Sequence, residues 1–171
     1  FIVLTFLTCL PSPVPLQART DKPNLIVIMA DDLGYADVGF NGCKDIPTPN
    51  IDSIAAGGVK FSSGYVGYSV CGPSRASFIT GRYGQRFGLE RNPQYRTADD
   101  NMGLPLSETN LATTLKQVGY HSGIIGKWHL GDQPPFLPTR QGFDSYYGIP
   151  YSDDMTADKG PQRDWPPLPL M

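Results

Sequence analysis

The apolar residues of the chain fall in short runs that predict alternating strands and helices. Strands are predicted over 24–29, 59–66 and 120–125. Helices are predicted over 50–56, 73–80 and 109–118. The first strand, NLIVIM, has no polar alternation, which is typical of a central strand buried on both faces. The alternation of elements favours an α/β fold with a largely parallel sheet.

Individual residues mark the ends of the predicted helices. Asn50 is the expected N-cap of the first helix, and Pro73 fits the first turn of the second. Glycine follows each of the three helical stretches and is the usual residue at a helix C-terminus. From Pro134 onward proline and glycine dominate, so that part is expected to be mostly irregular loop.

Length and charge narrow the class of protein. The chain has 171 residues, enough for one domain with a real core. The 14 Lys and Arg residues stand against 16 Asp and Glu, a formal net charge of −2. No basic field is present to attract nucleic acid or an anionic membrane surface.

The first ten residues, FIVLTFLTCL, form an apolar run that prolines follow at once. A bilayer span needs about 20 apolar residues, so this run is too short for a transmembrane helix. It fits the hydrophobic part of a secretory signal ending near Ala18, which predicts export to a periplasm, the extracellular space or a lysosome. A buried N-terminal strand is the alternative. Because the chain starts at Phe1 and ends abruptly at Met171, we expect it to be part of a longer protein.

The three cysteines are Cys9, Cys43 and Cys71. Removal of a signal would leave the last two, which could pair in an exported protein or stay separate. The absence of a C-x-x-C pair or a Cys/His cluster gives no support for zinc. Cys43 is expected to be a small buried or unpaired residue.

A first candidate site is Asp31-Asp32, directly after the first predicted strand. Ligands of open α/β sheets bind beyond the carboxyl ends of the strands. Two adjacent carboxylates there repel each other unless a cation neutralises them, and oxygen ligands favour Ca²⁺ or Mg²⁺. The alternative is a solvated turn with two exposed acids.

A second candidate site is Cys71 with Arg75, at the start of a predicted helix. Free backbone N–H groups and the helix dipole favour an anion there, and the Arg75 guanidinium one turn later can hold it. Cys71 would then be a nucleophile beside an oxyanion pocket. The alternative is a buried structural cysteine before an ordinary helix.

A third candidate site is Lys127 with His129, just beyond another predicted strand. In extended backbone the two side chains share a face, which sets a cation for a sulfate or phosphate oxygen beside a proton-transfer group. The alternative is a surface lysine with a partly buried histidine. His121, the other histidine, is expected to be structural within its strand.

Together and in this order, the three segments resemble the signatures of the type I, formylglycine-dependent sulfatases. The motifs are 31–34 (DDLG), 71–82 (CGPSRASFITGR) and 126–131 (GKWHLG). Segments 48–52 (TPNID) and 141–144 (QGFD) also match, and 148–152 (GIPYS) is similar to the arylsulfatase A-like branch. The resemblance covers residues 22–171. It implies an alkaline-phosphatase-like α/β fold, of which this chain is the N-terminal part of the catalytic domain.

The resemblance also implies a sulfuric ester hydrolase. A formylglycine-generating enzyme would convert Cys71 to formylglycine (3-oxoalanine), whose hydrate would attack sulfur and then expel sulfate. Asp31, Asp32 and the modified Cys71 would bind a divalent cation, Ca²⁺ with Mg²⁺ as the alternative. The resemblance assigns further roles to Arg75 (holding the hydrate), Lys127 (bridging nucleophile and sulfate), His129 (base for sulfate release) and Ser152 (a weaker substrate contact).

Parts of the family pattern are not found in this sequence. We identify no second Asp-Asn pair of metal ligands, no second active-site histidine and no second active-site lysine in a suitable context. The chain by itself is therefore expected to be inactive. Two alternatives stay open: a phosphonate or phosphate monoester hydrolase of the same superfamily, and a non-catalytic sulfatase-like domain that binds sulfated glycans.

Overall fold

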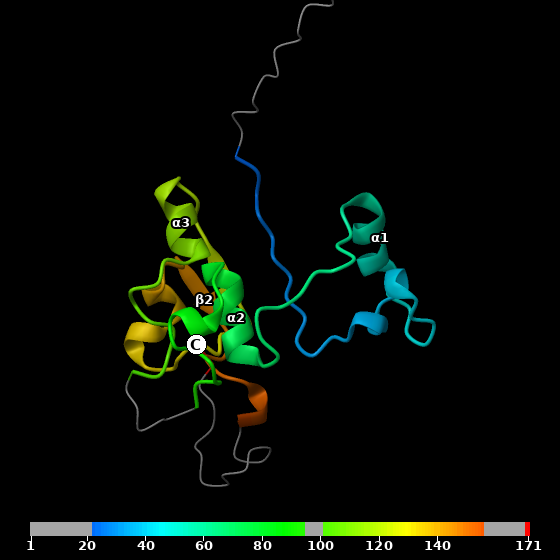
Figure 1. Ribbon diagram of the computed structural model, residues 1–171. Coiled ribbons are helices and arrows are strands. Elements are labelled where there is room, and N and C mark those ends of the chain that lie inside the picture. Colours follow the sequence, from blue (N-terminus) through cyan, green and yellow to red (C-terminus); the bar gives the residue numbers. More distant parts are fainter. Residues whose placement is uncertain (1–21, 95–100, 156–169) are drawn as a thin grey trace, which may run out of the picture. The chain divides into compact units, whose positions relative to one another are not determined.

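The structure is a computed structural model that describes residues 22–94, 101–155 and 170–171 (Figure 1). The expectations for the signal segment, Cys9 and Ala18 lie outside the described residues. The chain divides into two compact units, residues 1–34 and residues 35–171. No helix among the described residues is long and apolar enough to cross a membrane.

The described part of the first unit is an extended segment that carries the predicted strand 24–29. The prediction is wrong in this structure, because the segment pairs with no strand in the described part of the chain. Its side chains are exposed, with Ile26 at 85% and Ile28 at 83%. A central strand requires a hydrogen-bonded neighbour on each edge, and hydrophobicity alone does not supply one.

The described part of the second unit contains three α-helices close to the predicted positions. They are α1 (Pro49–Gly57), α2 (Cys71–Thr80) and α3 (Leu111–Gln117). Glycine ends α2 as expected, because Gly81 adopts a φ of 65° and its N–H donates to the Ser77 carbonyl at 2.9 Å. Asn110 and Thr113 form a reciprocal capping box at the start of α3. The predicted N-cap of α1 is wrong by two residues, since Thr48 occupies that position.

Short turns of 3-10 helix connect these elements. They are η1 (Tyr35–Asp37), η2 (Gly39–Asn41), η3 (Gly84–Arg86), η4 (Pro134–Phe136), η5 (Pro138–Arg140) and η6 (Asp153–Met155). Around η2, the Thr48 hydroxyl accepts the Gly39 N–H at 2.8 Å and donates to an Asp52 carboxylate oxygen at 3.1 Å. These bonds tie α1 to η2 through side chains of the TPNID segment.

The described residues form one sheet of two parallel strands, β1 (Gly123–Ile125) and β2 (Ser145–Tyr147). The register sets Ile124 opposite Tyr146. Strand β1 confirms the end of the predicted strand 120–125, whereas β2 was missed because proline and glycine dominate its surroundings. The predicted strand 59–66 is wrong: it pairs with no strand among the residues that the structure describes, and Phe61 and Tyr65 are 79% and 91% exposed.

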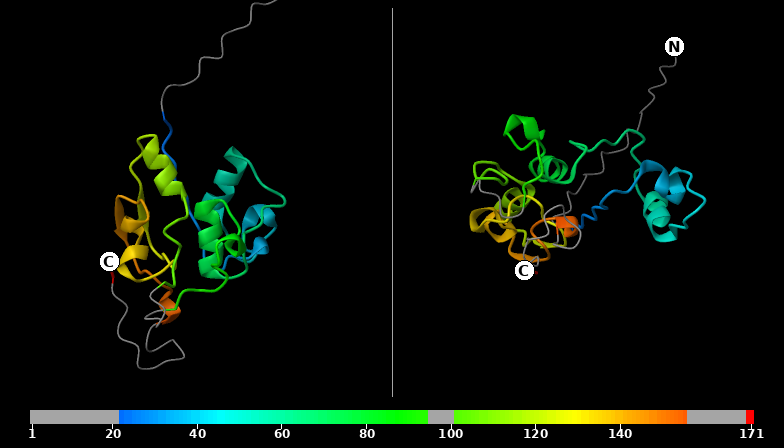
Figure 2. Two further views of the ribbon diagram at one scale, coloured as in Figure 1. Left: turned by 60° about the vertical axis from the view of Figure 1, so that its left-hand side comes forward. Right: turned by 90° about the horizontal axis from the view of Figure 1, so that it is seen from below.

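The core of the second unit lies between α2 and the loops that follow β1. Its fully enclosed members are Ala76, Leu89, Leu104, Trp128 and Leu130. The rings of Trp128 and Phe143 pack edge to face, with their centroids 5.9 Å apart. The Trp128 indole N–H donates to the Phe136 carbonyl at 2.9 Å. Helices α2 and α3 contact each other, and Figure 2 shows them in two further views.

Gly148, just after β2, leaves no room for a side chain. A Cβ at this position would overlap the carbonyl group of Gly126. That carbonyl is backbone and cannot swing away, so the two chain segments would have to separate. We expect Gly148→Ala to lower the free energy of unfolding by about 2 kcal/mol or more, measured by urea denaturation.

Gly57→Ala is the matched control for this prediction. A Cβ at Gly57, the last residue of α1, would meet no heavy atom within 4 Å. Its effect should stay within about 1 kcal/mol of the wild type and tend towards stabilisation. Equal effects of the two substitutions would contradict the close approach at Gly148.

Candidate active site

The segment that carries Lys127 and His129 is held by a continuation of the parallel sheet. Beyond the strands, the Gly126 N–H donates to the Tyr147 carbonyl at 2.9 Å. Further along, the Trp128 N–H donates to the Ile149 carbonyl at 3.0 Å, and the His129 N–H donates to the Pro150 carbonyl at 2.9 Å. The GKWHLG and GIPYS segments thus lie side by side because of backbone hydrogen bonds.

The Cys71 end of α2 lies against this segment. Cys71 is the first residue of α2 and is half-buried. A Cβ at Gly72 would lie 3.0 Å from the His129 carbonyl oxygen and 2.8 Å from Cδ of Pro93. The first turn of α2, the backbone of His129 and the loop at Pro93 therefore meet at one point. The positive end of the α2 helix dipole favours an anion at such a position.

Arg75 joins α2 to the lysine of the third motif. Its guanidinium Nη1 donates to the Lys127 carbonyl oxygen at 2.6 Å. This bond links residues far apart in the sequence, and it places a fixed positive charge one helical turn after Cys71. The second and third predicted sites are therefore brought together in the second unit.

His129 is buried at this meeting point, with 1% of its surface exposed. Burial, with the nearby charges of Lys127 and Arg75, lowers its pKa from 6.5 to about 4, although the Pro93 carbonyl and Asp154 oppose the shift. The imidazole is therefore neutral at pH 7. Its Nε2 lies 3.2 Å from the Pro93 carbonyl oxygen, while Nδ1 has no hydrogen-bond partner within the described residues. A neutral imidazole whose ring nitrogen has an unshared lone pair can accept a proton.

Ser152 follows the paired segment and is also buried, at 7% exposure. Its carbonyl accepts the Met155 N–H at 3.1 Å at the start of η6. Asp154, in the same turn, is close enough to His129 to act on its charge. The substrate contact expected of the Ser152 hydroxyl stays a prediction.

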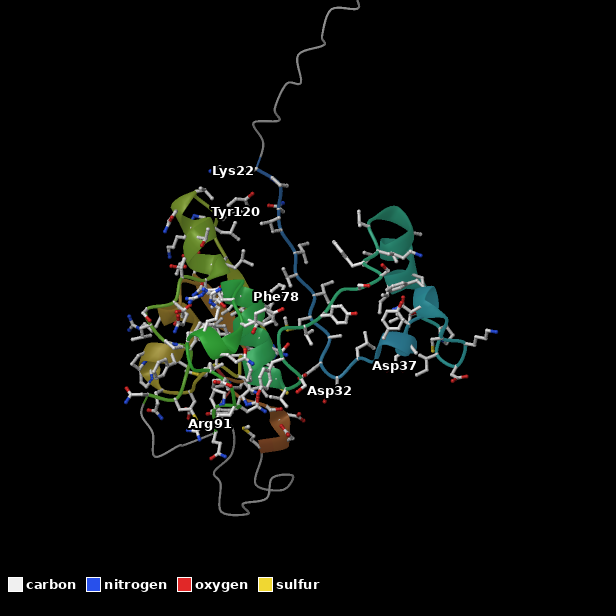
Figure 3. All side chains as sticks on the ribbon, viewed as in Figure 1. Lys22, Asp32, Asp37, Phe78, Arg91 and Tyr120 are labelled. Carbon is white, nitrogen blue, oxygen red and sulfur yellow. The ribbon has the colours of Figure 1, made fainter. Side chains whose placement is uncertain are left out.

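The first predicted site, Asp31-Asp32, belongs to the first unit, and Cys71 to the second. Both carboxylates are exposed, and Figure 3 labels Asp32 on the extended segment that follows Lys22. Among residues 22–94, 101–155 and 170–171, no group of three or more His, Cys, Asp or Glu side chains is arranged to hold a metal. The paired carboxylates are of the oxygen type that hard cations prefer.

The remaining candidates from the sequence are placed away from this point. His121 lies before β1, and its side chain is 95% exposed, 3.8 Å from an Asp144 carboxylate oxygen. The expectation of a structural histidine within a strand is therefore wrong. Cys43 is half-buried and carries a free thiol, which agrees with the unpaired state expected of it.

Sequence reasoning missed Asn92 and Pro93. The Asn92 side-chain oxygen accepts the Gly72 N–H at 2.7 Å, and the Pro93 carbonyl faces His129. The only local feature of the sequence at this point is an X-Pro step, which indicates a turn and says nothing of its distant partners.

The sulfatase family model matches residues 23–165, which is most of the chain. The chain belongs to the sulfatase family. It is 44% identical over 173 aligned positions to arylsulfatase G of Canis lupus familiaris, and the match covers 99% of this chain and 32% of that protein. It is 48% identical over 139 positions to arylsulfatase A of Bos taurus, covering 80% and 27%. The chain thus spans about a third of the length of these arylsulfatases.

Solved sulfatase structures confirm the expected fold class. The crystal structure of Ps i-CgsB matches with a TM-score of 0.73 and 49% identity, over 77% of this chain and 29% of that one. The putative sulfatase yidJ from Bacteroides fragilis matches with a TM-score of 0.67 and 31% identity, over 81% and 34%. Sulfatases of this family use formylglycine and a divalent metal.

The buried imidazole of His129 predicts a pH-dependent stability. Between pH 6.5 and about 4 the unfolded chain binds a proton at His129 that the folded chain does not. The free energy of unfolding should therefore fall as the pH falls through this window, by roughly 3 kcal/mol at the limit. Urea denaturation at several pH values measures the slope.

Two histidine variants separate this cause from others. His129→Gln should flatten the slope between pH 6.5 and 4, because it removes the group with the lowered pKa. His121→Gln is the matched control and should change the slope less than His129→Gln does, because that side chain is 95% exposed. An unchanged slope in His129→Gln would show that the lowered pKa does not govern acid stability.

Proposed function

We propose that the protein hydrolyses sulfate esters with a formylglycine nucleophile made from Cys71. The observation that carries this proposal is the meeting of the Cys71 end of α2 with Arg75, the Lys127 backbone and the buried neutral His129. Family membership supports it, since arylsulfatases A and G are among the relatives. This activity is proposed for the whole protein. The chain described here spans about a third of the length of its arylsulfatase relatives.

The residues around Cys71 suit a reaction at a tetrahedral anion. Arg75 and Lys127 contribute positive charge on one side, and the start of α2 contributes backbone dipoles. Formylglycine, in its hydrated form, supplies one hydroxyl that attacks sulfur and a second whose deprotonation releases sulfate. His129 is the acceptor for that second proton, because its ring is neutral at pH 7 and its Nδ1 has no hydrogen-bond partner in the part described.

We assign the divalent cation to Asp31, Asp32 and the modified Cys71, with Ca²⁺ favoured over Mg²⁺. The donor chemistry fits a hard cation, since all three contributions would be oxygen atoms. Three donors are fewer than the 6–8 oxygens around Ca²⁺, so the complete protein must contribute others. When bound, the cation would polarise the sulfate ester and favour ionisation of the nucleophile.

The proposal also implies a partner and a destination. A formylglycine-generating enzyme must oxidise Cys71, and Pro73 and Arg75 complete the motif that it reads. Sulfatases homologous to this chain are exported or lysosomal, and we propose export for this protein as well. Residues 1–18 would be the signal and residues 22–171 the first part of the catalytic domain. Ser152 and Lys127 would contact the substrate.

The proposal predicts a mass change at one cysteine. In the complete protein from its own host, the peptide that contains Cys71 should be about 18 Da lighter than its sequence mass, as expected for conversion of a thiol to an aldehyde. The protein should hydrolyse an aryl sulfate, and Cys71→Ala should reduce that rate to background because the nucleophile is lost.

Cys43→Ala is the matched control, because Cys43 is also a half-buried cysteine but lies outside the site. It should keep both the mass change at residue 71 and the aryl sulfatase rate. An unmodified Cys71 thiol with no turnover would favour a domain that only binds sulfated glycans. Faster turnover of an aryl phosphonate than of the aryl sulfate would favour the phosphonate hydrolase alternative.

A further inference from the structure

Two adjacent loop residues contact both halves of the site. The Asn92 side-chain oxygen accepts the Gly72 N–H at 2.7 Å, in the first turn of α2. The carbonyl oxygen of Pro93, the next residue, lies 3.2 Å from Nε2 of His129. Pro93 is buried and Asn92 is half-buried, and Figure 3 labels Arg91 directly before them. A two-residue segment therefore joins the nucleophile's helix to the imidazole.

The contact at Pro93 determines which ring nitrogen carries the proton. A carbonyl oxygen only accepts hydrogen bonds, so a neutral His129 that bonds to it must carry its hydrogen on Nε2. Nδ1 then holds the lone pair, and it is the ring atom without a hydrogen-bond partner among the described residues. A second group that fixes the tautomer of a functional histidine in this way also fixes the orientation of its ring.

The contact at Asn92 fixes the start of α2. The N-cap residue, Val70, makes no side-chain cap bond and has no polar side chain that could make one. The Asn92 oxygen satisfies one of the free N–H groups of the first turn instead, as an N-cap side chain would. That N–H belongs to the residue immediately after Cys71. Movement of Asn92 would therefore shift the backbone next to the residue-71 nucleophile.

We propose that Asn92 and Pro93 are positioning residues that set the distance and orientation between the residue-71 nucleophile and Nδ1 of His129. The proposal rests on the function proposed above. Neither residue needs to touch the substrate, because each acts through a neighbour. A shift of about 1 Å between reacting groups can lower a rate by about a hundredfold, so a segment that fixes both groups has a large effect on kcat.

Asn92→Ala and Asn92→Asp in the complete protein test the proposal. Alanine removes the acceptor, so kcat for an aryl sulfate should fall about tenfold or more with KM within about twofold, while the mass change at Cys71 is kept. Aspartate keeps an oxygen at the same reach, so kcat should stay within about threefold, while its negative charge raises KM for an anionic substrate.

Thr48→Ala is the matched control for a structural effect. It removes a similar bond, from the Gly39 N–H to a part-buried side-chain oxygen at 2.8 Å, but at η2 and α1. Both alanine variants should lower the urea midpoint of unfolding by a similar amount, and only Asn92→Ala should lose kcat. Equal kcat values for the two variants would overturn the proposal.

A spectroscopic measurement tests the Pro93 contact without any turnover. In protein labelled with ¹⁵N-histidine, long-range ¹H–¹⁵N spectra distinguish the two neutral tautomers, and His129→Gln identifies the signal. The wild type should show a hydrogen on Nε2 alone, and Asn92→Ala should show a mixture of tautomers. A hydrogen on Nδ1 in the wild type would overturn the proposal, whereas a wild type without aryl sulfatase activity would overturn the proposed function instead.

Discussion

The parallel backbone pairing that starts at β1 and β2 and continues to His129 is the interaction on which the site depends. The two strands have only three residues each, yet hydrogen bonds extend the pairing to the His129 N–H and the Pro150 carbonyl. The pairing needs Gly148, because the backbone of Gly126 comes too close for a side chain. Main-chain hydrogen bonds thus hold the backbone of the segment that carries Lys127 and His129.

Burial gives this arrangement its electrostatic character. A histidine with 1% exposure between two cationic residues stays neutral, because desolvation and the charges of Lys127 and Arg75 all oppose protonation. The same Arg75 is held in place by the Lys127 carbonyl at 2.6 Å, so its charge cannot move into solvent. Fixed positive charge beside a neutral proton acceptor is a suitable environment for a sulfate dianion, and the cost is reduced stability in acid.

The sequence predicted the helices better than it predicted the strands. Helix α2 follows from local features that include Pro73 and Gly81, which act within one turn. A strand, in contrast, depends on a partner that is distant in the sequence. The apolar run 24–29 has no such partner in the described part of the chain. Strand β2 has no strong sequence pattern, but it pairs with β1. Asn92 could not be found from the sequence for the same reason, because its contact with Gly72 depends on the fold and not on any local pattern.

Left-handed backbone outside glycine is found at two of the residues that the sequence motifs contain. In the part of the chain that the structure describes, only two residues other than glycine have a positive φ: Asp32 at 52° and His129 at 59°. Each left-handed residue costs about 1 kcal/mol, which persists where surrounding contacts or a functional requirement hold it. At His129 the bond to Pro150 and the enclosure of the ring supply that restraint. Asp32 is exposed, and aspartate adopts this conformation more readily than most residues because its short polar side chain can bond locally.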